Sequence, residues 1–223
     1  MTLRRFAILA VQLIPFLLLT LAGWGWDDWR GFFSHPARAG LIAAIVLGAG
    51  LVLRFQLDLQ PLRRGRSVVG SQTLVLLVLV LTSLFLVWFL PFADRREMLR
   101  FTQHPFLRYL GLVMCCLGIA VRLLALAKLG RHFSAYVTLQ DDHQLVQSGI
   151  YGIVRHPLYL SLLLAASGFA LVFASVLVWP ILLVAAAFVT IRIREEDNLL
   201  ESRFGVEFRE YRGRTGALLP RVG

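Results

Sequence analysis

The hydrophobic positions of this chain fall into long blocks separated by short polar segments. A helix needs about 20 apolar residues to cross a bilayer. Four blocks approach this length, at residues 6–23, 38–53, 72–92 and 107–127. A fifth block, residues 158–193, is too long for one crossing. Pro180 and the small residues Ala174 and Ser175 lie near its middle, so we predict a tight helical hairpin there and six spans in all.

The first block has some features of a secretory signal peptide, because Arg4 and Arg5 precede it. It lacks a convincing small-residue cleavage site, however. Three tryptophans follow it in the manner of an interfacial belt, at positions Trp24, Trp26 and Trp29. We therefore predict that this block is a genuine helix of the folded protein.

Composition agrees with the class that the pattern predicts. The chain has 223 residues, of which 58% are hydrophobic and 16% charged. Its mean hydropathy is +0.72, well outside the range of soluble domains. The predicted fold is all-α: a polytopic membrane bundle of about six transmembrane helices, with a C-terminal helical hairpin and a short cytoplasmic amphipathic helix.

Basic residues predict the orientation in the membrane. They occur at the N-terminus, after the second span, after the fourth span and in the C-terminal tail, and all four segments lie on one side if six helices alternate. Both termini are therefore expected in the cytoplasm. One group of arginines does not fit this arrangement, because it lies on the opposite side: Arg95, Arg96, Arg100 and Arg108. Asp94 and Glu97 offset it in part.

The net charge of +10 does not require a nucleic acid partner. A basic cytoplasmic face beside anionic lipid explains this charge more simply, and no nucleic-acid-binding motif is present. We expect membrane lipids as neighbours, no nucleic acid, and a multi-pass protein of a bacterial inner membrane. The oligomeric state is left open.

The sequence lacks the motifs of several kinds of metal and cofactor site. Cys115 and Cys116 are adjacent and mid-span, without a partner at metal-ligand spacing, so packing between helices is the expected role and no metal site is predicted. There is no GxGxxG or Walker lysine loop. The two longest polar pieces, residues 128–157 and 192–223, are too short to fold as separate domains. Any cofactor must therefore lie between these pieces and the helix ends.

Isolated polar residues have plainer explanations. Arg122, alone in the fourth span, is expected to snorkel to the cytoplasmic interface. His35 and His104 each precede a proline on the opposite side and are expected to be turn or interface residues. For His132 and His143, in the long cytoplasmic loop, a structural role and a role in a site both stay open.

Two motifs flank the predicted hairpin and emerge on the same side of the membrane. The first is GIYGIVRHPLYL, residues 149–160, and the second is RIREEDNLLESRFG, residues 192–205. Arg192 and Glu196 are four residues apart, so a continuing helix places them on one face. The second motif alone could be an ordinary solvated amphipathic helix with Leu199, Leu200, Phe204 and Phe208 as its apolar side. Together the motifs predict a polar site, containing Arg155, His156, Tyr159, Arg192 and Glu196.

The order HQLVQSGIYGIVRHPLY, apolar hairpin, RIREED, RFGVEFREY and LLP resembles the isoprenylcysteine carboxyl methyltransferase family, to which phospholipid methyltransferases are related. The resemblance covers residues 123–220. It implies a methyltransferase that uses S-adenosyl-L-methionine, bound on the cytosolic side, and a lipidic or small hydrophobic methyl acceptor. It also implies a division into N-terminal membrane helices, residues 1–106, and a methyltransferase-like core, residues 107–223, folded as one membrane domain.

The resemblance also implies roles for single residues. By motif position the cofactor pocket takes His143, Gln144, Leu145, Val146, Tyr151, His156, Pro157, Leu158, Tyr159 and Glu196. Arg192 takes the substrate-facing position, and Arg192, Glu196 and Arg155 are the candidate catalytic residues. Two positions depart from many relatives, because Asp197 stands in place of a second glutamate and Ile150 in place of a proline.

Two other classes stay open at this point. A membrane reductase of the sterol-reductase type would bind NADPH, and a non-enzymatic transporter or scaffold would bind neither nucleotide cofactor. The sequence does not identify the acceptor, nor whether oxygen, nitrogen or sulfur is methylated. Arg192 favours an anionic acceptor.

Overall fold

The computed structural model describes residues 3–55, 71–100, 105–129 and 145–221, and in this part of the chain the regular structure is helical. The long helices are α1 (Leu3–Trp24), α3 (Pro36–Arg54), α4 (Ser71–Arg95), α5 (Pro105–Leu129), α6 (Pro157–Val172) and α7 (Val178–Phe204). Shorter pieces join or follow them: η1 (Trp26–Asp28), α2 (Trp29–Ser34), η3 (Gly149–Gly152) and α8 (Val206–Arg214). Each predicted span therefore coincides with a helix.

Proline marks where three of the helices begin. Pro36, Pro105 and Pro157 are the first residues of α3, α5 and α6. This position suits proline, since the first backbone N–H groups of a helix have no partner within it. His35 lies between α2 and α3 and caps the N-terminus of α3, where its Nδ1 accepts a hydrogen bond from the Ala37 N–H at 3.2 Å. His35 is thus the turn residue that the sequence predicted.

The predicted hairpin is present between α6 and α7, and its bend lies at residues 173–177. Ala174 takes the left-handed conformation with φ of +48°, and the Leu177 N–H donates to the Ser175 hydroxyl at 3.2 Å. Pro180 does not form the bend. It lies in the first turn of α7, where a missing N–H is tolerated.

α5 and α6 pack at unusually close range through small residues. A Cβ added to Gly111 would lie 2.6 Å from the Gly168 carbonyl oxygen, and one added to Gly168 would lie 2.6 Å from the Gly111 oxygen. Such small-residue contacts are typical of helices that associate in a membrane. Cys115 is buried at this contact, as predicted, whereas Cys116 is exposed, so the packing role holds for Cys115 alone.

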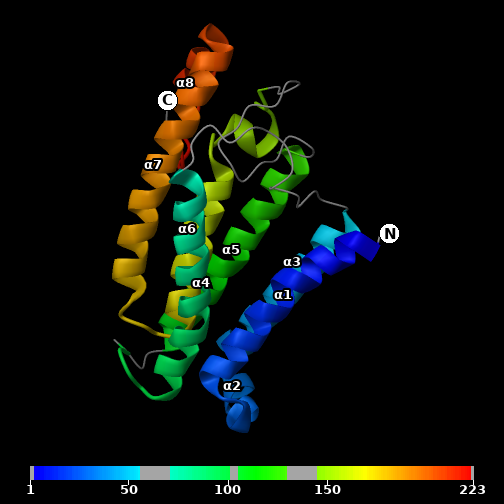
Figure 1. The fold of residues 1–223 in the computed structure, drawn as a ribbon, viewed down its shortest axis with the longest axis vertical. Helices are drawn as coiled ribbons and strands as arrows, with labels where there is room; N and C mark the ends of the chain where they lie inside the picture. Colours follow the sequence, from blue (N-terminus) through cyan, green and yellow to red (C-terminus); the bar gives the residue numbers. More distant parts are fainter. Residues whose placement is uncertain (1–2, 56–70, 101–104, 130–144, 222–223) are drawn as a thin grey trace.

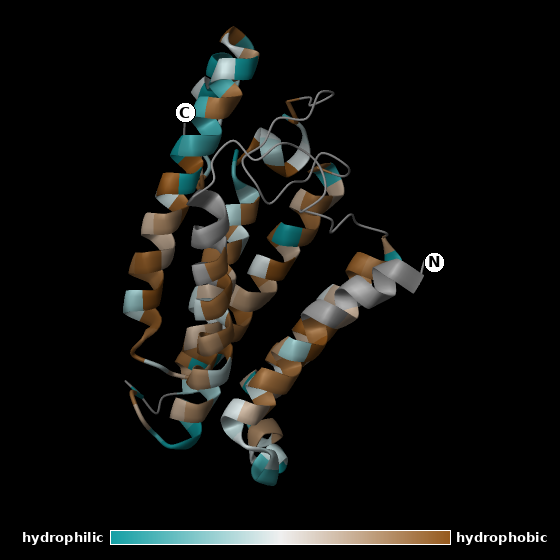
Figure 2. Ribbon diagram, in the orientation of Figure 1, coloured by the Kyte–Doolittle hydropathy of each residue, from teal (hydrophilic) through white to brown (hydrophobic). Residues whose placement is uncertain are grey.

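Two helices within the described residues, α3 and α5, are long and apolar enough to cross a membrane by the measures of length and composition. Figure 2 shows hydrophobic colour along the middle of the helices and hydrophilic colour at α8, at the end of α7 and around α2. The chain is therefore an all-helical bundle of membrane type, in agreement with the predicted fold class.

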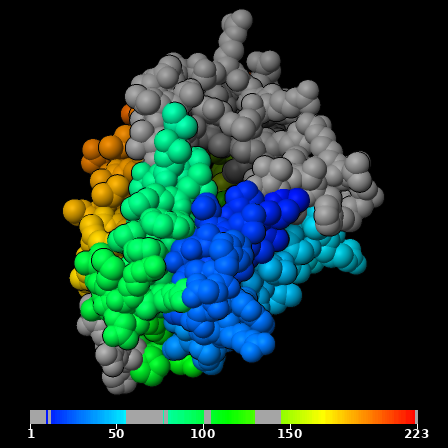
Figure 3. Space-filling view, turned by 60° about the horizontal axis from the view of Figure 1, so that its bottom comes forward, coloured from blue at the N-terminus to red at the C-terminus, as the bar shows by residue number. Residues whose placement is uncertain are grey.

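The N-terminal helices are an integral part of the bundle. α1 packs along α4 and against α3, and α3 packs on α5 (Figure 1). Figure 3 shows the blue α1 and α2 beside the green helices. Trp24 belongs to the buried core with an exposure of 6%, whereas Trp26 and Trp29 are exposed. The predicted aromatic belt is therefore wrong for Trp24.

Candidate functional site

The C-terminal part of α7 carries three polar side chains that face the start of α6. Arg192 and Asp197 are buried, with exposures of 6% and 7%, and the Glu196 side chain is 38% exposed. The neighbouring Arg194 and Glu195 are exposed. Arg192, Glu196 and Asp197 reach the start of α6 because α7 continues from the hairpin without a break.

Tyr159, in the first turn of α6, joins Arg192 to Glu196. Its phenol is close enough to both residues to interact with them electrostatically, which agrees with the expected place of Arg192 and Glu196 on one face of α7. Arg192 also approaches Glu195, with Nη1 and Oε2 3.6 Å apart. The guanidinium is therefore held at the site before any ligand arrives.

His156, the residue before α6, lies between two carboxylates. Its Nε2 is 2.8 Å from Asp197 Oδ1, which is a hydrogen bond, and its Nδ1 is 3.7 Å from Glu196 Oε2, which is too long for one. The imidazole ring is 5.8 Å from the Tyr159 ring, centroid to centroid. With an exposure of 4%, His156 connects the buried acid Asp197 to the half-exposed acid Glu196.

Arg155 points toward the C-terminal segment. Its Nη1 donates to the carbonyl oxygens of Thr215 and Arg212, the latter at 3.2 Å, and its Nη2 lies 3.7 Å from Asp197 Oδ2. The Arg155 side chain is 8% exposed. In this position it fastens the residues after α8 to the site, and its predicted catalytic role stays a prediction.

The backbone before α6 forms a short pairing with the C-terminal segment. Arg155 and His156 donate their N–H groups to the carbonyl oxygens of Gly216 and Ala217 at 2.9 and 3.0 Å. On the other side of Arg155, the Tyr211 hydroxyl donates to the Tyr151 carbonyl oxygen at 2.7 Å. Thus α8 and the residues after it close the site from the side away from the bundle.

Two tyrosines here stay neutral at ordinary pH. Burial raises the pKa of the Tyr211 phenol to about 12, and burial together with the charge of Glu196 raises the pKa of Tyr151 above its usual range. Tyr151 is 7% exposed, so its side chain is part of the packed interior. Both rings therefore act as buried supports, with the Tyr211 hydroxyl as a hydrogen-bond donor.

The predicted cofactor loop is described only in part. His143 and Gln144 lie outside the described residues, as do His104 and His132. Leu145 and Val146 are half-buried, Pro157 is buried and Leu158 is half-buried. Gln147 anchors this stretch to α8, since its Nε2 donates to Glu207 Oε1 at 2.8 Å and Arg214 donates to its Oε1. Arg122 lies on α5 with an exposed side chain.

Asp197 is the site residue that the sequence did not identify. It was noted only as a departure from relatives, yet it contacts both His156 and Arg155. Its place in a run of three acidic residues gave no signal, because such runs on a helix are usually solvated. The feature of the sequence that could have identified it is its position directly after Glu196, from which its side chain faces the first motif.

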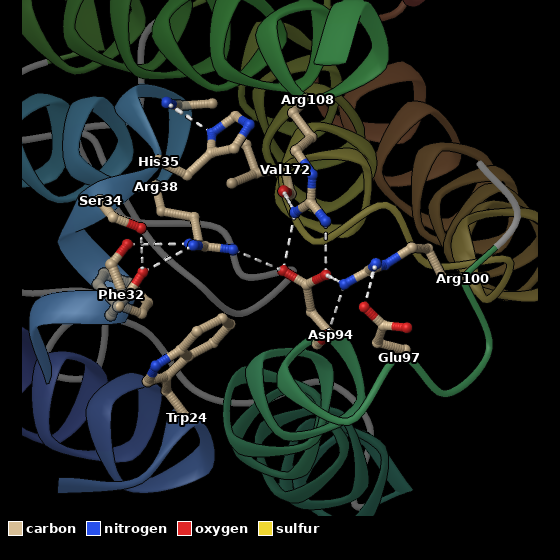
Figure 4. Close-up of polar contacts among 12 residues, drawn as sticks. Trp24, Phe32, Ser34, His35, Arg38, Asp94, Glu97, Arg100, Arg108 and Val172 are labelled. Carbon is tan, nitrogen blue, oxygen red and sulfur yellow. Dashed lines mark hydrogen bonds and ion pairs between the residues drawn. The ribbon is translucent and has the colours of Figure 1, made fainter. Parts of the chain in front are cut away.

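A second polar cluster lies at the opposite end of the molecule, around the buried Asp94 at the end of α4 (Figure 4). Arg108 binds its carboxylate with two hydrogen bonds, of 2.6 and 2.8 Å. Arg38 reaches the same carboxylate at 3.1 Å and Arg100 at 3.2 Å. The carboxylate of Asp94 is thus shared by three guanidinium groups from three parts of the chain.

Each of these arginines also binds the C-terminal end of a helix. Arg38 donates to the Phe32 and Gly31 oxygens of α2, Arg108 to the Val172 oxygen of α6, and Arg100 to the Asp94 oxygen of α4. A helix C-terminus carries up to about half a negative charge. Three such ends and one carboxylate together balance most of the charge of three arginines, so the cluster serves to join helix ends.

The arginines that opposed the predicted orientation have local partners, in the Asp94 cluster or beside it. Arg100 and Arg108 are bound to Asp94, and Arg95 donates to Asp27 Oδ2 at 2.5 Å. Arg96 lies over the Phe92 ring at 3.7 Å. All four arginines therefore have local partners. From the sequence alone, Asp94 and Glu97 could be recognised only as a partial balance of the arginine charge.

Fold and site together define the class: a helical membrane protein with a histidine, an arginine and two carboxylates gathered where a hairpin meets the polar C-terminal helices. Residues 109–202 match the family model of the isoprenylcysteine carboxyl methyltransferase family. The match confirms, over this part of the chain, the resemblance that the motifs predicted.

Three characterised relatives show the extent of the similarity. Protein-S-isoprenylcysteine O-methyltransferase B of Arabidopsis thaliana is 32% identical over 127 residues, which is 54% of this chain and 62% of that protein. The Saccharomyces cerevisiae protein-S-isoprenylcysteine O-methyltransferase is 34% identical over 114 residues, 50% of this chain and 48% of its own. The cobalt-zinc-cadmium resistance protein CzcN of Cupriavidus metallidurans is 40% identical over 100 residues, 44% of this chain and 46% of that protein. In each case the match spans less than two thirds of the relative's length.

The fold also resembles a solved structure, that of the eukaryotic intramembrane Ras methyltransferase ICMT, an isoprenylcysteine carboxyl methyltransferase. The TM-score is 0.58 at 22% identity, and the superposition covers 97% of this chain and 75% of that one. The likeness therefore extends beyond residues 109–202 to the N-terminal helices, for which the sequence gave no specific match.

Proposed function

We propose that this protein is an integral membrane methyltransferase that uses S-adenosyl-L-methionine and methylates a lipidic acceptor with a carboxylate group. The observation that carries the proposal is the meeting of His156, Tyr159, Arg192 and Glu196 where the start of α6 faces the C-terminal part of α7, within the segment that matches the methyltransferase family model. The names of the relatives, several of which are protein-S-isoprenylcysteine O-methyltransferases, support an isoprenylcysteine-like acceptor.

The residues present fit the polar parts of the cofactor. Glu196 keeps 38% of its side chain exposed, and its carboxylate can accept hydrogen bonds from hydroxyl or amino groups. His156 Nδ1 faces the same carboxylate at 3.7 Å. Together with Tyr159 and the residues 143–146 and 157–158 they would hold S-adenosyl-L-methionine, which supplies an activated methyl group when bound.

Arg192 is suited to the other side of the reaction. Its guanidinium is a permanent cation with planar paired donors, so it binds a carboxylate and is a poor general base. Arg192 is buried, and a charge-assisted hydrogen bond there is stronger than at the surface. Arg192 would hold the acceptor carboxylate so that one oxygen faces the methyl group. Burial at the bundle end keeps water from competing with that oxygen.

The proposed orientation has six transmembrane helices, with both termini and the site on the cytoplasmic side of a bacterial inner membrane. The distribution of the basic residues supports it. Basic residues near Asp94 are matched by carboxylates, ring faces and helix ends, whereas Arg194 and several arginines of α8 are exposed near the site. A lipidic acceptor then reaches the site from the bilayer itself, which accounts for a methyltransferase built on membrane helices.

The proposal is tested with purified protein in detergent and methyl-labelled S-adenosyl-L-methionine. An S-prenylated cysteine with a free carboxylate is expected to become labelled in a base-labile ester. The matched control is the same compound with the carboxylate converted to an amide, which should accept no label. Label on the amide, or on phospholipid amines alone, would contradict the proposed acceptor.

A further inference from the structure

Asp197 is a buried carboxylate that contacts two residues of the first motif and lies next to the proposed cofactor-binding acid. Its Oδ1 is 2.8 Å from His156 Nε2, and its Oδ2 is 3.7 Å from Arg155 Nη2. The two bonds differ in kind, since the first is a hydrogen bond and the second an ion pair at longer range. Asp197 thus binds His156 directly and Arg155 mainly by charge.

The contact with Asp197 determines which nitrogen of His156 carries a proton. An ionised carboxylate only accepts hydrogen bonds, so at 2.8 Å the Nε2 atom must be the donor. The Nδ1 atom is then the one that faces Glu196, at 3.7 Å, and it is left without a hydrogen bond to that residue. Asp197 therefore turns one defined edge of the imidazole toward the place where Glu196 is exposed.

Arg155 depends on Asp197 for a different reason. Its side chain is 8% exposed, its Nε has no hydrogen-bond partner among the described residues, and Asp197 is the described acid that pairs with it. A buried cation without an opposite charge is costly. Because Arg155 Nη1 binds the Thr215 and Arg212 carbonyl oxygens, the charge of Asp197 also stabilises the segment that closes the site.

We propose that Asp197 is a positioning residue for cofactor binding: it fixes the protonated nitrogen and the orientation of His156, and it keeps Arg155 fastened to the C-terminal segment. The inference rests on the proposed function, in which His156 and Glu196 hold the cofactor. Asp197 touches neither cofactor nor acceptor in this assignment and acts through His156.

The test is a double-mutant cycle on the binding of S-adenosylhomocysteine, measured by calorimetry on the full chain in detergent. Asp197→Asn keeps the shape of the side chain and removes its charge, and His156→Ala removes the group that it positions. Each variant is expected to weaken binding by about tenfold, the loss of one charge-assisted hydrogen bond. The effect of the double variant should be clearly smaller than the sum of the two single effects, because both changes remove the contact between Asp197 and His156. Glu201→Gln is the matched control on the same helix and should leave binding unchanged.

Additive effects in the cycle, or unchanged binding by a folded Asp197→Asn protein, would overturn the inference. If Asp197→Asn does not fold, the wild-type protein still provides a test: nitrogen NMR of labelled histidine, with His156→Ala for assignment, should show a proton on Nε2. A signal with Nε2 unprotonated overturns the inference as well. Failure of the proposed function has a different signature, because wild-type protein would then bind no S-adenosylhomocysteine at all.

Discussion

Arg192 and Glu196 share one face of α7 but differ in surroundings. Arg192 is buried with an exposure of 6%, whereas the Glu196 side chain is 38% exposed. The phenol of Tyr159 interacts electrostatically with both residues. The geometry suits two neighbouring binding regions, one for an anionic acceptor beside the arginine and one for the cofactor beside the glutamate.

Replacing Arg192 by alanine should remove acceptor binding and leave cofactor binding nearly intact. A lost charge-assisted hydrogen bond in a buried site costs about 1.5–3 kcal/mol, which is roughly a ten- to hundredfold loss of kcat/KM. The measurement is methyl transfer to a prenylated cysteine, together with calorimetry of S-adenosylhomocysteine.

Arg194→Ala is the control for this change, since Arg194 is an exposed arginine of the same helix. Loss of a surface charge there should alter turnover by less than about twofold. If Arg192→Ala behaves like Arg194→Ala, then Arg192 does not contact the acceptor.

Replacing Asp94 by asparagine should destabilise the whole fold. The carboxylate is fully buried and holds Arg38, Arg100 and Arg108 together, so its loss leaves uncompensated buried cations. Removing one partner of such a buried network costs about 3–5 kcal/mol of the free energy of unfolding. Thermal unfolding in detergent measures the effect. Asp27→Asn, which breaks the exposed pair with Arg95, is the control and should change little; equal losses for the two variants would refute the structural role of Asp94.

The sequence predicted which residues of the two motifs the structure brings together, apart from Asp197, and missed the role of the buried acids Asp94 and Asp197. His156, Tyr159, Arg192 and Glu196 could be predicted, because both motifs flank one hairpin and therefore emerge at the same end. Asp94 and Asp197 could not, since their roles depend on which side chains neighbouring helices bring near them. Arg38 and Arg108, for example, are 56 and 14 residues from Asp94.

At the scale of the helices, prediction was accurate for position and weaker for packing. Blocks of apolar residues mark most of the long helices within a few residues, as with block 107–127 and α5 (Pro105–Leu129), but α7 continues well beyond block 158–193 to Phe204. The hairpin bend was expected from Pro180 and from Ala174 and Ser175, and only the last two lie in it. Hydropathy also says nothing about which face of a membrane helix meets a neighbour, because lipid-facing and buried faces are equally apolar.

Replacing Gly111 by alanine should push α5 and α6 apart. Its new Cβ would lie 2.6 Å from both the Gly168 oxygen and the Val172 backbone nitrogen, where nothing can move without shifting a helix. Overpacking of this kind costs about 1–3 kcal/mol, seen as a lower temperature of unfolding. Gly50→Ala on α3 is the control, because nothing lies within 4 Å of its added Cβ. A Gly111→Ala protein as stable as Gly50→Ala would show that the close contact is not required.

At the scale of the whole molecule, the bundle has two polar ends with different roles. One end contains the candidate site, with α8 and the C-terminal segment fastened over it. The other end contains the Asp94 cluster, which joins α2, α3, α4, α5 and α6. The arginines that opposed the predicted orientation, Arg95, Arg96, Arg100 and Arg108, have local partners at the second end, and the orientation stays a prediction.

The orientation predicts that a green fluorescent protein fused after Gly223 is fluorescent in a bacterial cell. A phosphatase that is active only outside the cytoplasm should work when it replaces the chain after Met98, and should fail after Gly223. The reverse pattern would place the candidate site on the outer side, where S-adenosyl-L-methionine is not supplied.

The central claim is that the site formed by α6 and α7 binds the methyl donor. Calorimetric titration of the purified full-length protein with S-adenosylhomocysteine tests it most directly, with NADPH and a Glu196→Gln variant in parallel. The account predicts saturable binding of S-adenosylhomocysteine, none of NADPH, and binding that is ten- to hundredfold weaker, roughly, in a folded Glu196→Gln protein. Binding of NADPH without S-adenosylhomocysteine would contradict the proposed class, and unchanged affinity in Glu196→Gln would contradict the site.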